Sequence, residues 1–136
     1  MEALYKDIVN QLRNVHLKGY DSFYASKQKT HGLSPLKKSW IIAIASLTGV
    51  KCEPTTISGE FYIVYRGDDN LVNLIGSLEI KAEKFIMKRV KEESIKSGIK
   101  DRFKSVALKT QLYNELNSML MLSDMDRFKK RKISTI

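Results

Sequence analysis

Apolar side chains recur every three or four residues along several stretches of the chain, which is the period of one face of an α-helix. The pattern predicts helices over residues 3–17, 35–47 and 70–97, and a fourth from residue 99 to about residue 123. The helix at 35–47 is the most hydrophobic and is expected to lie in the centre of the fold. The third and longest helix has its apolar positions at Leu71, Ile75, Leu78, Ala82, Ile86 and Val90.

Residues with special backbone preferences mark the ends of these helices. Ser34 and Pro35 form a helix start, because serine accepts hydrogen bonds at the N-cap and proline fits the first helical position. Gly49 ends that helix, and Gly98 separates the third helix from the fourth. Because this connection is short, the last two helices are predicted to lie antiparallel. The fourth helix is expected to bury Ile99, Phe103, Val106, Tyr113, Leu116 and Leu120.

One part of the chain has the composition of a β-sheet. Residues 60–65 are predicted to form a strand, because residues 61–65 are aromatic or β-branched throughout, as strands prefer. Residues 50–53 form a partner strand across a turn at residues 54–59. The pattern therefore predicts one small β-hairpin. Residues 20–29 are ambiguous and are interpreted as a short helix capped by Asp21.

These elements predict a mainly α protein of the α+β class, a compact helical domain with one small β-hairpin and a C-terminal antiparallel pair of long helices. A hydrophobic fraction of 43% is sufficient for a core. We expect a single domain over residues 1–136, divided into helices and hairpin (1–70), a long helical hairpin (71–126) and a basic tail (127–136). The start of the chain does not resemble a signal peptide, and no apolar run is long enough to span a membrane.

Positive charge is concentrated in the last half of the chain. The whole chain carries a formal charge of +9, and residues 71–136 contain 15 basic and 8 acidic side chains. At about 100° per residue, four lysines of the third helix form a stripe roughly 80° wide, away from the apolar face. We call Lys81, Lys84, Lys88 and Lys91 the lysine stripe. The tail adds Arg127, Lys129, Lys130, Arg131 and Lys132.

This segregation predicts a non-enzymatic accessory protein that binds nucleic acid through its phosphates. A helix stabilised only by surface ion pairs would alternate charges at i,i+4, whereas here neighbouring lysines repel one another. Lysine supplies point charge rather than bidentate base recognition, so low sequence specificity is expected, with DNA and RNA both open. A solvated outer face is the alternative interpretation of the lysine stripe. The Lys- and Ile-rich composition is common in phage and viral proteins.

The sequence is also compatible with other functions. Met119, Leu120, Met121 and Leu122 are consecutive, so one buried face cannot hide all four. The protein could therefore form a homo-oligomer through its long helices, bind a partner, or lie on an anionic membrane like a matrix protein. A winged helix-turn-helix also fits the order of elements, although the helix at 35–47 is too apolar for a recognition helix.

The expected location is the cytoplasm, or the nucleus of a eukaryotic cell, since the tail resembles an import signal.

No pattern supports catalysis strongly, and no metal or cofactor is expected. The two histidines and the single cysteine, Cys52, lack the spacing of a zinc site or a nucleophilic triad. A remote alternative is a Mg²⁺-dependent nuclease using Asp69, Glu79 and Lys81. That site would require Glu79 and Lys81 on a strand, but the helical period separates them by about 200°. Glu79 is therefore predicted to be a surface carboxylate at the edge of the third helix.

Overall fold

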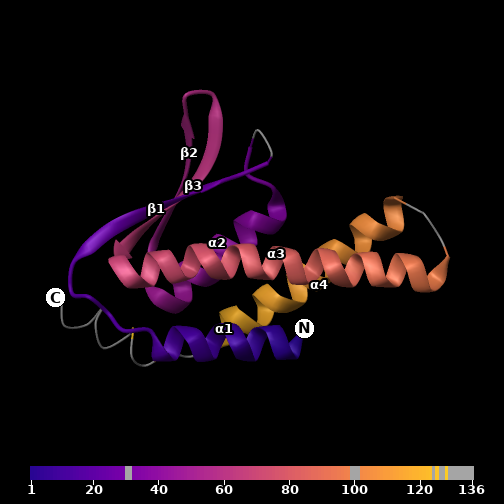
Figure 1. Cartoon of the computed structure of the whole chain (residues 1–136), viewed down its shortest axis with the longest axis horizontal. Helices are drawn as coiled ribbons and strands as arrows, with labels where there is room; N and C mark the ends of the chain where they lie inside the picture. Colours follow the sequence, from indigo (N-terminus) through magenta and orange to yellow (C-terminus); the bar gives the residue numbers. More distant parts are fainter. Residues whose placement is uncertain (30–31, 99–101, 124, 126–127, 129–136) are drawn as a thin grey trace.

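Four helices and a three-stranded antiparallel sheet make up the computed structural model of the chain (Figure 1), which describes residues 1–29, 32–98, 102–123, 125 and 128. The elements follow in the order α1 (Glu2–Asn14), β1 (Asp21–Lys27), α2 (Pro35–Thr48), β2 (Lys51–Ile57), β3 (Glu60–Asp68), α3 (Asp69–Ser97) and α4 (Arg102–Leu122). The mainly helical character with a small β component is confirmed.

The predicted ends of the helices are confirmed where local chemistry defines them. The Ser34 hydroxyl accepts the Lys37 backbone N–H at 3.3 Å, and Gly49 ends α2 in the left-handed conformation with φ 74°. Gly98 ends α3 in the same way. Asp68 caps the start of α3 and also accepts the backbone N–H of Gly19 at 2.9 Å. That one carboxylate therefore joins the chain before β1 to the start of the longest helix.

The prediction of a short helix over residues 20–29 is wrong, because β1 occupies this segment. β1 forms an edge of the sheet, in the order β1-β3-β2, and pairs with β3 from Asp21↔Asp68 to Lys27↔Tyr62. Side chains alternate between the two faces of a strand. Tyr24 and Ser26 point toward α3, and Phe23 points away. The buried face of β1 thus contains serine, which hides the usual strand pattern.

The predicted hairpin exists but is longer than expected. β2 continues through Pro54 to Ile57, and the turn is limited to Ser58 and Gly59, whose φ values are both positive at 52° and 79°. Two positive φ values are the geometry of the tightest hairpin turns, and they match the twist of the flanking strands. Pro54 is tolerated because β2 is an edge strand, where a missing N–H need not disrupt the sheet.

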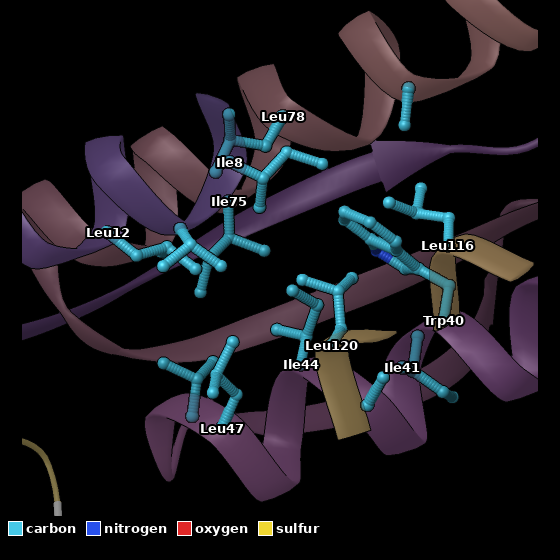
Figure 2. Packing of buried hydrophobic residues seen from close by; sticks show 14 of the residues in the cluster. Ile8, Leu12, Trp40, Ile41, Ile44, Leu47, Ile75, Leu78, Leu116 and Leu120 are labelled. Atoms are coloured by element: carbon cyan, nitrogen blue, oxygen red, sulfur yellow. The ribbon is translucent and has the colours of Figure 1, made fainter. Parts of the chain in front are cut away.

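The core is formed where α4 meets the other three helices (Figure 2). Leu116 and Leu120 of α4 are fully buried and lie near Trp40 and Ile44 of α2 in the close-up. The same cluster includes α1 residues such as Ile8 and the buried face of α3. A single hydrophobic core therefore joins the sheet and all four helices.

The other end of the helical hairpin differs from the prediction. α4 turns back along α3 (Figure 1), but Phe103 and Val106 are 87% and 57% exposed instead of buried. Tyr113, Leu116 and Leu120 are buried as predicted, and Ile99 lies outside the described residues. Only the second half of α4 reaches the α1–α2 core, so its first turns have less to pack against. Met121 and Leu122 are also exposed, as expected for a run that one face cannot hide.

Candidate functional site

The lysine stripe lies on the outer face of α3, and all four of its side chains are exposed. The opposite face of the helix is buried from Leu71 to Val90, which fixes the orientation of the stripe relative to the core. Lys81 forms an ion pair with Asp7 of α1. Among the described residues, Lys84, Lys88 and Lys91 form no ion pair. Three of the four predicted lysines are therefore available to bind an anion.

Most acidic residues of α3 lie away from these three lysines. Glu83 points toward Lys37 of α2, with its Oε2 3.6 Å from the Lys37 Nζ. Glu93 lies about 160° from Lys91 around the helix, whereas Glu92 follows Lys88 by four residues and lies about 40° from it. Apolar side chains share the exposed face instead, at Ile80, Met87 and Ile95. The result is a surface on which three lysines lie near one exposed carboxylate, Glu92, and form no ion pair with it among the described residues.

The rest of the predicted basic site belongs to the tail. Arg127, Lys129, Lys130, Arg131 and Lys132 lie outside the described residues. Phe128, in the same segment, is only 5% exposed and belongs to the core cluster, as does Met125. The start of the tail is thus anchored by two apolar side chains.

The three residues of the nuclease alternative do not converge. Asp69 accepts the Ser22 hydroxyl at 2.6 Å and pairs with Lys18 at 3.1 Å. Ten residues of helix, about 15 Å along the axis, separate it from Glu79, while Lys81 pairs with Asp7. Asp69 and Glu79 therefore have separate partners and cannot share one metal ion in this arrangement.

Glu79 is not the surface carboxylate that the sequence predicted, because it is 4% exposed and lies between α3, α2 and the sheet. Its Oε2 accepts hydrogen bonds from the Ser26 hydroxyl at 2.9 Å, the Gln28 side chain at 3.1 Å and the Lys37 Nζ at 3.1 Å. Its Oε1 accepts the Tyr65 hydroxyl. A buried carboxylate with a cation and several donors is a satisfied structural group.

The hydrogen bonds of Glu79 continue into α2, since the Tyr65 oxygen in turn accepts the Trp40 Nε1–H at 3.0 Å. Sequence reasoning missed all the partners of Glu79, which come from β1 and the residue after it, from α2 and from β3. The burial of Glu79 itself could have been predicted from its position on the helix. Val72 and Val90, which are buried, lie within about 20° of Glu79 around the helix, so the apolar face extends to include it.

Opposing effects act on the pKa of the Glu79 carboxyl. Burial raises this pKa, but the Lys37 ammonium and the hydrogen bonds from Tyr65, Gln28 and Lys37 outweigh burial and hold it below the ordinary value of 4.5. Glu79 is therefore ionised at neutral pH. Burial also raises the pKa of the Cys52 thiol, to about 12, so this cysteine is not an activated nucleophile.

Acid is expected to destabilise the protein through Glu79. Because the folded-state pKa lies below the unfolded value of 4.5, ionised Glu79 contributes stability that is present above pH 4.5 and is lost as the pH falls through the folded-state pKa. Urea unfolding at a series of pH values should show this loss, and Glu79→Gln should reduce the slope below pH 4.5. Equal slopes in the two proteins would mean that Glu79 does not titrate in this way.

The described part of the chain offers little support for other kinds of site. No three His, Cys, Asp or Glu side chains among its residues gather as metal ligands would. None of its helices has the length and apolar character of a membrane span. The chain matches no known family model, and no curated protein or solved structure shows significant similarity to it.

Proposed function

We propose that the protein binds nucleic acid, without acting on it chemically, through the phosphate groups. The observation that carries this proposal is the set of three exposed lysines on α3, Lys84, Lys88 and Lys91, without an ion-pair partner among the described residues. Aligned like charges repel one another, and a bound polyanion relieves that repulsion by neutralising them. The buried opposite face holds the helix in place, so little ordering is needed on binding.

The geometry suits backbone contacts better than base recognition. The three lysines rise along α3 by about 6 Å and then about 4.5 Å, a scale comparable to the spacing of phosphates along a strand. Lysine ammonium groups bind phosphates as point charges and do not provide the bidentate geometry that reads bases. The proposed partner is therefore DNA or RNA bound with low sequence specificity, in the cytoplasm or a nucleus. The tail would extend the contact.

Charge reversal on α3 provides the direct test. Lys84→Glu combined with Lys88→Glu should abolish binding to labelled single- and double-stranded DNA and RNA, measured by fluorescence anisotropy at several salt concentrations. In the native chain, each duplex phosphate neutralised should contribute about −0.9 to the slope of log affinity against log salt. The fold should be unchanged, because both side chains are exposed.

A matched control reverses two lysines elsewhere. Lys6→Glu combined with Lys29→Glu changes the net charge equally, but on α1 and after β1, and should leave most of the binding intact. The proposal fails if the native chain binds no nucleic acid at low salt, or if both double variants lose affinity equally. Mg²⁺-dependent cleavage of nucleic acid by the purified protein would show that the protein is a nuclease and would contradict the proposal.

A second candidate function is an interaction module. It is favoured by the exposed apolar side chains at the free end of the helical hairpin, among them Met87, Ile95 and Val106. With the neighbouring lysines, such a surface would suit an anionic membrane. Sedimentation with vesicles of anionic and of neutral lipid distinguishes this function. Binding to anionic vesicles that Met87→Gln and Ile95→Gln weaken, while nucleic-acid binding is unaffected, would support it.

A further inference from the structure

The sheet has one face without a helix on it in the described part of the chain. Tyr24 and Ser26 of β1 point toward α3, where the Tyr24 ring lies against Gly76 and Ser26 bonds Glu79. Alternation therefore directs Phe23, Ala25 and Lys27 to the opposite side. Antiparallel sheets commonly leave one face to solvent, but that face is then polar. We call this side the sheet outer face.

The centre of the sheet outer face is apolar. Phe23 is 62% exposed, although the Arg66 guanidinium lies 5.5 Å from the centre of its ring. Ala25 is exposed beside it, whereas its pairing partner Val64, on the same side of the sheet, is only 4% exposed and lies beneath its neighbours. Tyr62 of β3 continues the patch and is half-buried. Phe23, Ala25 and Tyr62 together form an apolar surface rimmed by charged side chains, and such a surface is typical of a site of protein association.

The charges around this patch are balanced, unlike those of the rest of the chain. Lys51 pairs with Glu53 at 2.9 Å, and Lys27 pairs with Glu60 at 3.0 Å. Arg66 lies 3.8 Å from Glu53. The cations of this face are Lys27, Lys51 and Arg66, and its carboxylates that are not buried are Asp21, Glu53 and Glu60; Asp68, opposite Asp21, is buried as the cap of α3. A net charge of zero on a chain of charge +9 does not favour a polyanion.

We propose that the sheet outer face is a self-association surface on which a second copy of this chain docks, sheet against sheet. A two-fold contact places the same patch on both copies, so it requires a self-complementary surface. An apolar centre between charges of both signs meets that requirement, because cations of one copy can face carboxylates of the other. On α3, by contrast, two copies would bring their lysine stripes together and repel.

The size of the surface limits the strength of this dimer. Strands of seven residues, at about 3.4 Å per residue and about 4.8 Å apart, give three strands a flat area of roughly 350 Å². A standard stable interface buries about 800 Å² per partner. The dimer is therefore weak and forms at micromolar or higher concentration. The dimer would also present two lysine stripes to one polyanion. That consequence rests on the proposed function, whereas the formation of the dimer does not depend on it.

Sedimentation velocity of the full chain, from low-micromolar to near-millimolar concentration, tests the proposal. The mass should rise from 15.6 kDa toward twice that value. Phe23→Asp should weaken dimerisation at least tenfold, since a central aromatic residue carries much of an interface's affinity. Met87→Asp is the matched control, because it places the same charge at an exposed apolar position on α3, and should leave the dimer intact.

A second measurement does not depend on the folding of the Phe23 variant. Ala25→Cys should form a disulfide between two copies under mild oxidation faster than Ile95→Cys, because only position 25 lies in the proposed contact. A monomer at the highest concentration overturns the proposal, as does a dimer that Met87→Asp abolishes and Phe23→Asp does not. A monomeric chain whose single-strand binding falls with Phe23→Asp would show instead that this face stacks on bases.

Discussion

Replacing Glu79 by alanine should lower the free energy of unfolding by about 3 kcal/mol, because breaking a buried ion pair leaves its other charge without compensation. The Lys37 Nζ would lose its partner at 3.1 Å in a site where the lysine side chain is only 13% exposed. Ser26, Gln28 and Tyr65 would lose an acceptor as well. Glu83, 3.6 Å from Lys37, remains and keeps the loss at the lower end of the range for such pairs.

Guanidinium unfolding followed by circular dichroism measures this effect. Glu92→Ala is the matched control, since it removes an exposed carboxylate from the same helix and should change stability by less than about 0.5 kcal/mol. Replacing both partners, Glu79→Leu with Lys37→Met, should recover much of the loss, because no buried charge then remains. A loss below about 1 kcal/mol for Glu79→Ala would argue that Lys37 and the other donors reach solvent easily.

Replacing Gly76 by alanine is the second change with a large expected effect. An added Cβ would lie 2.3 Å from the Tyr24 Cε1, closer than real Cβ contacts, so either the ring or the helix must shift. Overpacking of this kind typically costs about 1–3 kcal/mol. Alanine normally stabilises a helix interior by about 1 kcal/mol relative to glycine. The sign of the measured change therefore shows whether α3 and β1 are in close contact at this position.

The Tyr24→Ala background separates packing from helix propensity. Without the ring, Gly76→Ala should become neutral or stabilising in the same unfolding experiment. Ser77→Ala, at the next, exposed position of α3, should have a small effect in both backgrounds. If Gly76→Ala stabilised the native chain, the close packing of α3 on β1 would be wrong.

The helices could be predicted because their signals are local. The N-cap of α2 at Ser34 and the glycines after α2 and α3 act within one or two turns of the positions they define. The long period of apolar residues placed α3 within a residue of its observed start. These features depend little on what the helix packs against, so a single sequence contains them.

Features that depend on distant partners could not be predicted. β1 is a strand because β3 lies beside it, and its inward Ser26 suits that place only because Glu79 is there. The exposure of Phe103 also depends on distant parts of the chain, because α4 extends beyond the region in which the other elements can cover it. The lysine stripe was predicted as a surface feature. The ion pair between Lys81 and Asp7 could not be predicted, because it depends on how α1 packs against α3.

The way α1 is held has a consequence for folding during synthesis. α1 and β1 leave the ribosome before the elements they contact: β1 pairs with β3, and α1 packs against α3 and α4, with Tyr5 hydrogen-bonded to Ser123 just after α4. Contacts between segments so far apart form late, because a long loop must close first. The nascent chain therefore leaves β1 unpaired until β3 has been made, and exposes part of the apolar face of α1 until α4 has been made. A ribosome that stalls before α4 would release a fragment prone to aggregation.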